Sequence, residues 1–467
     1  MAPAHVVLWI ASGILFGIFS ASIGAHGIAF VALAVSLCIA GAAKKAPRVA
    51  VIMCLISFAC GTFYYFLFIR ASAAREVIPA RAEPFEAIVI SEPRFTERSQ
   101  RFTVRLASPF YGTATVVTRI SPEFAYGDLL HITGEVARTE EDPRERYTVL
   151  FPSIELVAQD KGNVLRTTLL RFKSRALHEF THLLPHDEAS LMSGITLGAR
   201  GDFDAELKTQ MSRSGTTHLV ALSGYNISIL ALVAFGIFGA FLKRRTAFIC
   251  VTIIITGFVL MVGGEASVVR AALMGFLVLF AREAGRLYDV RNAILLTALM
   301  MAFIDPRILA YDVGFQLSFG SFLGILFLET PMRRMLCLGD TPGILGWREN
   351  LATTLAAQSA VMPLLAFTFG TASIASFIAN ILILGIMPLV MTVGFFLAAL
   401  GMLWSAAGFL IAPLAGILLK YILGVIALFS LFYTLPGTFF SHTALILCYY
   451  AGLVFLGYYF RDGKERQ

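Results

Sequence analysis

The feature that most constrains this chain is a series of apolar runs, most of them close to the length of a membrane span. An α-helix needs about 20 apolar residues to cross the hydrocarbon core of a bilayer. Only 14% of the 467 residues are charged, whereas soluble domains have about 25%. The sequence therefore predicts a polytopic α-helical membrane protein with about 13 spans, and it excludes a single soluble globule.

The N-terminal part, residues 1–69, is predicted to be a membrane anchor of three spans. Its apolar runs lie at 6–24, 27–43 and 49–69. Three basic residues stand between the second run and the third: Lys44, Lys45 and Arg48. Because basic residues concentrate in cytoplasmic loops, the N-terminus is expected in the cytoplasm. The chain is then expected to emerge on the outer side of the membrane near Arg70.

Residues 70–163 change character, because charges of both signs appear and apolar residues alternate with polar ones. Such alternation is typical of half-buried strands, and proline and glycine punctuate these stretches as turns. About five short strands in a segment of this size suit a small β-barrel such as an OB-fold. We therefore expect an all-β, OB-like domain outside the membrane.

One edge of this expected domain combines arginine with aromatic residues. The set is Arg94, Phe95, Arg98, Arg101, Phe102 and Arg105. Arginine attracts phosphate and aromatic rings stack on bases, so the mixture is typical of a platform for single-stranded nucleic acid. The alternative is that the aromatic residues belong to the barrel core and the arginines form a solvated face. Acidic residues nearly balance the basic ones in this segment, which favours that alternative on composition alone.

Residues 164–215 are expected to form amphipathic helices that lie in the membrane interface. The first of them contains His178-Glu179-Phe180-Thr181-His182, which matches the H-E-x-x-H pattern. Two histidines one turn apart can hold zinc, with Glu179 as general base, as in a membrane metallopeptidase. Arg171 and Arg175 share this face and would repel a dication. A solvated polar face is therefore favoured, and neither a metal nor another cofactor is expected.

Polar side chains interrupt the apolar runs of residues 216–467, where each costs free energy unless it meets a partner or water. The set is His218, Ser223, Asn226, Glu265, Arg270, Asp312, Gln316, Gln358 and Asn380. Interhelical hydrogen bonding explains any one of them, whereas together they predict a polar path through a channel domain. Ser223 and His218 are not assigned as a catalytic pair, because five residues along one helix is a poor spacing for a hydrogen bond between them.

Five stretches of the chain resemble, in order, the motifs of the ComEC-type competence proteins. They are Leu197–Arg200, His218–Gly224, Val269–Met274, Asp305–Phe319, and Gln358 leading through Pro363 to Asn380. The three-span start and the outer β segment also resemble the N-terminal part of that family. The resemblance therefore covers nearly the whole chain, and Gly314-Phe315-Gln316-Leu317-Ser318-Phe319 is its most specific part.

The resemblance implies a channel in the bacterial cytoplasmic membrane that passes single-stranded DNA into the cytoplasm during natural transformation. It implies that the OB-like domain receives DNA on the outer side. It also implies a separate cytoplasmic motor ATPase, a DNA receptor and a nuclease as partners. Many members continue into a metallo-β-lactamase-like domain, whereas this chain stops at Gln467, so a form without that domain is expected. Asn226 stands where the family usually has a second histidine, so no titratable role is expected there.

Two further points bear on function. The chain has no P-loop or dinucleotide fingerprint, so we expect no ATP-driven motor within it. A transporter or flippase for another solute, with the β domain as an assembly module, stays open as an alternative.

Overall fold

The computed structural model divides into two compact units. The first consists of Met1–Thr168 and Val269–Gln316, and the second of Leu169–Val268 and Leu317–Gln467. The described residues are 3–29, 48–79, 83–96, 98–139, 144, 147–199, 203–220, 222, 224–283, 289–338, 347–369, 371–373, 375–432, 434–436 and 443–460. The expected run at 27–43 therefore lies largely outside the described residues.

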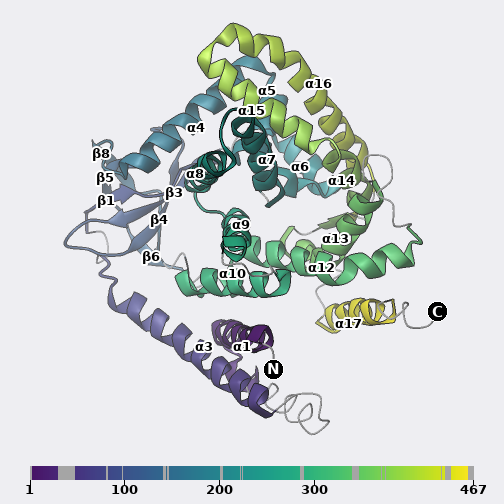
Figure 1. The fold of residues 1–467 in the computed structure, drawn as a ribbon. Helices are drawn as coiled ribbons and strands as arrows, with labels where there is room; N and C mark the ends of the chain where they lie inside the picture. Colours follow the sequence, from purple (N-terminus) through teal and green to yellow (C-terminus); the bar gives the residue numbers. More distant parts are fainter. Residues whose placement is uncertain are drawn as a thin grey trace. The chain divides into compact units, whose positions relative to one another are not determined.

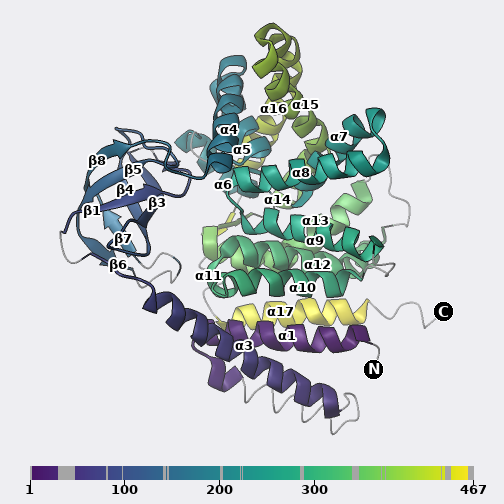
Figure 2. The ribbon, with the colours of Figure 1, turned by 60° about the vertical axis from the view of Figure 1, so that its left-hand side comes forward.

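Helices of the first unit pack around the N-terminal helix. They are α1 (Pro3–Ser22), α3 (Arg48–Ala74), α10 (Val290–Ile304) and α11 (Ile308–Tyr311), and α9 (Ala266–Glu283) also belongs mainly to this unit. Helix α1 lies along α3 (Figure 2) and also contacts α10. A small apolar core of Ile18, Ala21, Tyr65 and Ala302 joins these three helices. The Tyr311 hydroxyl donates a hydrogen bond to the Ser22 carbonyl oxygen at 2.7 Å, which attaches α11 to the end of α1.

Glycines allow α1 and α3 to approach closely. A methyl group at Gly61 would overlap the Ile14 carbonyl oxygen, and one at Gly17 would overlap the Phe58 carbonyl oxygen. Small residues at such crossings bring backbones together, which is how helices commonly associate in lipid.

Substituting Gly61 tests this packing. We expect Gly61→Ala to lower the free energy of unfolding by about 1–3 kcal/mol, because the two helices must move apart. The measurement is chemical unfolding of the purified protein in detergent. Gly27→Ala is the matched control, since nothing lies within 4 Å of the added methyl group there. Equal stability of the two variants would contradict the close packing.

The all-β domain lies in the first unit and is built on one sheet. Its strands are β1 (Phe85–Val89), β2 (Arg94–Phe95), β3 (Ser99–Leu106), β4 (Thr113–Arg119), β5 (Leu129–Thr133), β6 (Val136–Arg138), β7 (Tyr147–Leu150) and β8 (Ser153–Ala158). The sheet order is β6-β7-β4-β3-β1-β5-β8, with β2 paired to β3. Figure 1 shows the strongly twisted sheet at the left of the view.

The pairing pattern of this sheet is that of an OB-fold. Strands β1, β3 and β4 form an antiparallel meander, β5 pairs with β1, and β7 runs parallel to β4. Strand β8 then pairs antiparallel with β5. Only Phe151 and Pro152 separate β7 from β8. The two strands therefore act as one bent strand that pairs with β4 through its first half and with β5 through its second half. The expectation of an OB-like domain is confirmed.

Alternate residues of these strands fill the core of the β domain. Strand β3 shows strict alternation, with Gln100, Phe102, Val104 and Leu106 buried and Arg101 and Arg105 exposed. The core combines these apolar side chains with others from the neighbouring strands, including Phe85, Val116, Leu130 and Val149. The alternation of apolar and polar residues in the sequence therefore determines which face of each strand is buried.

The second unit contains most of the remaining helices. They are α4 (Val164–Leu183), α5 (His186–Leu197), α6 (Ala205–Ser214), the 3₁₀ helix η1 (Thr217–Val220), α7 (Gly224–Phe241), α8 (Arg244–Val262), α12 (Val313–Met335), α13 (Trp347–Phe369), α14 (Ser376–Leu384), α15 (Met387–Leu403), α16 (Ser405–Ser430) and α17 (Thr443–Tyr459). Two short strands, β9 (Thr371–Ser373) and β10 (Thr434–Pro436), pair antiparallel. Helices α15 and α16 form a long hairpin (Figure 1).

Among the described residues, six helices are long and apolar enough to cross a membrane. A seventh span results if α14 and α15, which meet at a bend of 53°, are counted as one broken span. Shorter apolar helices, such as Val290–Ile304, lie in addition to these. The multi-pass helical architecture is confirmed, whereas the expected number of about 13 spans and the four expected sequence segments stay predictions.

Candidate nucleic-acid interface and polar membrane residues

The outer side of β3 carries most of the arginines expected to bind nucleic acid. Arg101 and Arg105 are exposed and point to the same side of the strand. Arg94 on β2 is exposed and is the direct cross-strand partner of Arg101. Arg98 is exposed in the turn between β2 and β3. Like charges directly opposite one another destabilise a sheet unless an opposite charge lies nearby.

The two aromatic residues of the expected set differ in their exposure. Phe95 is exposed at 36%, whereas Phe102 is buried at 2% and packs edge-on against Phe124 in the core of the β domain. A fully packed ring offers no free face to a base. The expectation that Phe102 stacks on nucleic acid is therefore wrong in this structure, because the alternation of β3 turns it inward.

Sequence reasoning missed Arg119, the last residue of β4. Arg119 is exposed and lies opposite Ser99, on the same side of the sheet as Arg101. Alternation along β4 contained the signal, since Arg119 is two residues beyond Val117, the partner of Arg101. We call Arg94, Arg101, Arg105 and Arg119 the arginine face.

Asp312 and Gln316, expected in a polar path, have partners within the first unit. The Asp312 carboxylate accepts a hydrogen bond from the Phe315 backbone N–H at 2.8 Å, which caps the start of α12. Its other oxygen lies 2.5 Å from Nη1 of Arg144, and the Arg144 guanidinium also donates to the Tyr311 carbonyl oxygen at 2.8 Å. Arg144 stands between β6 and β7, so this ion pair ties the β domain to the connection between α11 and α12.

The Gln316 side chain completes this connection. Its amide nitrogen donates to the carbonyl oxygens of Ala310 at 2.8 Å and Leu309 at 3.2 Å. These carbonyls belong to the short helix α11, whose end would otherwise be incompletely hydrogen-bonded. The most specific stretch of the family resemblance thus stabilises a helix junction. The amide nitrogen of Gln316 is used in this junction, so only the other atoms of its side chain can line a path.

Three polar residues of the second unit lie around the start of α7. Asn226 is buried and its amide nitrogen donates to the Ile195 carbonyl oxygen at 3.1 Å. The Ser267 hydroxyl bonds the Leu222 carbonyl oxygen. His218 is exposed on η1, directly before these residues. Ser223 lies outside the described residues.

The remaining residues of the expected polar path differ in how their polar atoms are satisfied. The Ser376 hydroxyl lies 3.4 Å from Oε1 of Gln358. Glu265 and Arg270 are half-buried, and neither is isolated. Asn380 is 1% exposed, and both its amide nitrogen and its amide oxygen have no hydrogen-bond partner among the described residues. Of the expected set, Arg270, Asp312 and Gln316 belong to the first unit and the other described residues to the second. The polar path therefore stays a prediction.

The H-E-x-x-H stretch lies on α4 with both histidines exposed. The rings of His178 and His182 stack with their centroids 6.4 Å apart. Oε2 of Glu179 lies beside Gly401 on α15, 3.0 Å from where a Cβ atom at that glycine would stand. Within the described part of the chain, one group of three ligating side chains could hold a metal ion: the exposed residues His186, Asp187 and Asp204. Among the described residues, His178 and His182 belong to no group of three or more metal-ligating side chains.

Comparison with known proteins decides the family. The model of the "Competence protein" family matches residues 195–462, which is more than half of the chain. The chain belongs to the competence protein family. It is 31% identical over 206 residues to ComE operon protein 3 of Bacillus subtilis (strain 168), a match that covers 43% of this chain. That match spans about a quarter (25%) of the length of the relative. No solved structure matches.

The family match overlaps the residues singled out above. It includes every expected path residue from His218 to Asn380, and it begins at Ile195, the backbone partner of Asn226. It does not include the β domain, whose OB-type pairing rests on the structure alone.

Proposed function

We propose that this protein is a membrane channel that passes single-stranded DNA into the cytoplasm during natural transformation. The β domain receives the strand on the outer side of the membrane, and the helices of residues 216–467 conduct it. A separate cytoplasmic ATPase supplies the work, and a DNA receptor and a nuclease deliver the single strand. Family membership supports the role in competence.

The observation that carries the nucleic-acid part of this proposal is the arginine face. OB-folds bind oligonucleotides across their second and third strands, which here are β3 and β4. Three of the four arginines stand on those strands, and the fourth pairs directly with β3. A row of exposed cations at this place suits the phosphates of an extended strand.

Salt dependence of binding tests the arginine face. We expect the full chain in lipid nanodiscs to bind a dT12 oligonucleotide with an affinity that falls steeply as salt rises. Each phosphate neutralised on a single strand contributes about −0.7 to the slope of log K against log salt. Arg101→Ala with Arg105→Ala is therefore expected to reduce that slope by about 1.4.

Arg138→Ala is the matched control for this measurement. Arg138 is an exposed arginine of the same domain, but strand pairing places it on the other side of the sheet, in line with buried Val149. Its substitution is expected to leave the slope unchanged. Equal effects of the two substitutions, or no binding of dT12 at low salt, would contradict the proposal.

A further inference from the structure

The corner between β7 and β8 presents an aromatic ring in an unusual backbone conformation. Phe151 has a φ of 46°, in the left-handed region that favours glycine or asparagine. Its backbone N–H donates to the Val117 carbonyl oxygen at 2.7 Å, which holds the corner against β4. Its side chain is nevertheless 62% exposed. Strained residues of this kind are frequent at ligand sites.

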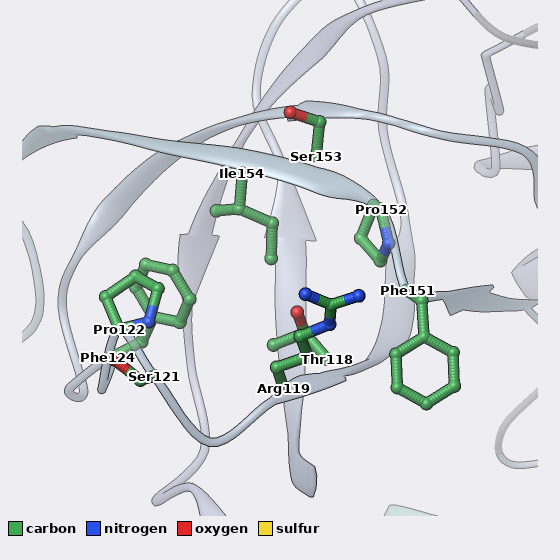
Figure 3. Close-up of a pocket in the computed structure, with 9 residues that line it drawn as sticks. All are labelled: Thr118, Arg119, Ser121, Pro122, Phe124, Phe151, Pro152, Ser153 and Ile154. Carbon is green, nitrogen blue, oxygen red and sulfur yellow. The ribbon is translucent and has the colours of Figure 1, made fainter.

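A pocket of about 400 Å³ lies beside this ring, between the end of β4 and the start of β8. Figure 3 shows the Arg119 guanidinium at its centre, with Phe151 and Pro152 on one side and Ile154 and Pro122 on the other. The pocket thus combines one cation with flat or apolar surfaces. A nucleobase attached to a phosphate has the matching chemistry, because its face is apolar and its linkage is anionic.

The loop after β4, which forms one wall of this pocket, is held by a side chain in the core of the β domain. Gln100 is fully buried (0% exposed), and its amide nitrogen lies 2.8 Å from the carbonyl oxygen of Arg119 and 2.5 Å from that of Pro122. Its amide oxygen accepts from the Phe124 backbone N–H at 3.3 Å. A buried side chain that satisfies several backbone groups of one loop holds that loop in a single conformation.

The pocket also continues the arginine face. Strand β7 runs parallel to β4 with Leu150 beside Val117, and Val117 is in turn the partner of Arg101. Arg119 therefore belongs both to the arginine face and to the pocket. A strand whose phosphates follow the arginines to Arg119 would bring a base to Phe151, which lines the same pocket as Arg119.

We propose that this pocket is a base-binding subsite for single-stranded DNA, in which Phe151 stacks on an unpaired base and Arg119 holds the adjacent phosphate. The subsite rests on the proposed function, since it takes the same ligand. It assigns the stacking role to Phe151, which lies in the connection between β7 and β8, whereas Phe95 and Phe102 lie on β2 and β3.

The experiment separates base contacts from phosphate contacts. The full chain in nanodiscs is titrated with dT12 and with an abasic oligonucleotide of the same number of phosphates. Wild type is expected to bind dT12 more tightly, by about 5- to 150-fold for one stacked base. Phe151→Gly is expected to abolish that preference and to leave the affinity for the abasic strand unchanged. Glycine relieves the backbone strain at this corner, so loss of folding does not explain such a result.

Two controls complete the test. Phe151→Trp is expected to keep the preference for dT12, and Phe95→Ala is expected not to change it. The subsite is overturned if wild type binds the abasic strand as tightly as dT12, or if Phe151→Gly weakens both ligands equally. In either case the binding of DNA itself stands. Failure of wild type to bind either oligonucleotide overturns the proposed function and the subsite together.

Discussion

Asp312→Ala is expected to lower the free energy of unfolding by about 2 kcal/mol. About 1 kcal/mol comes from the lost cap at the start of α12. The rest comes from the lost charged hydrogen bond to Arg144, a contact in which both side chains are mostly buried, at 24% and 28% exposed. Chemical unfolding of the purified protein in detergent measures the total. Hydrogen exchange of the first turn of α12 shows where the loss is located.

Asp312→Asn separates the two contributions. Asparagine is a good helix cap, so this variant keeps the bond to the Phe315 N–H and loses the charge that faces Arg144. We expect it to lose about half of the stability that Asp312→Ala loses. Combining it with Arg144→Ala should cost less than the sum of the single substitutions, because both remove the same ion pair. Additive effects would show that the pair contributes nothing to stability.

The ion pair between Arg144 and Asp312 also bears on function, because of where it lies. Arg144 and Asp312 are 168 residues apart in the sequence, yet their contact connects the β domain to the stretch most typical of the family. If the β domain receives DNA, the position of its β6–β7 connection is set by this contact. Arg144→Ala should therefore also reduce DNA uptake without changing the salt slope measured for the arginine face.

Asn380→Leu is expected to stabilise the protein while lowering DNA uptake. The Asn380 amide is 1% exposed, and neither of its polar atoms has a hydrogen-bond partner among the described residues. Burying an unsatisfied polar group costs about 1–3 kcal/mol, and leucine of similar size removes that cost. Because Asn380 lowers stability in this way, we expect it to have a role in the polar path. Unfolding in detergent and transformation of a competent strain that depends on this protein measure the two effects.

Asn226→Leu is the matched control, because Asn226 is also a buried asparagine of the second unit. Its amide nitrogen does have a partner, the Ile195 carbonyl oxygen at 3.1 Å. This substitution is therefore expected to destabilise the protein by about 1 kcal/mol. Destabilisation by Asn380→Leu would show that its amide is satisfied after all. Stabilisation with full DNA uptake would show that Asn380 has no role in transport.

The sequence was sufficient for the fold class because its two periodicities report directly on burial. Long apolar runs predict membrane helices, since backbone groups in lipid must be satisfied within the segment. Strict alternation in Ser99–Leu106 likewise predicts a strand with one buried face, and the structure confirms both. The same alternation places Phe102 inside, so its core position could have been read from the sequence.

The partners of polar side chains could not be read in this way. Nothing local indicates that Asp312 meets Arg144, that Gln100 holds the loop after β4, or that Phe151 stands exposed at a strand corner. Each of these depends on contacts between segments that are distant in the sequence, and no local pattern reports such contacts. The sequence by itself determined the membrane helices, the β domain and the family resemblance. Only the tertiary structure decided which polar groups are already satisfied, that the Asn380 amide has no partner among the described residues, and that the Phe151 ring stands exposed.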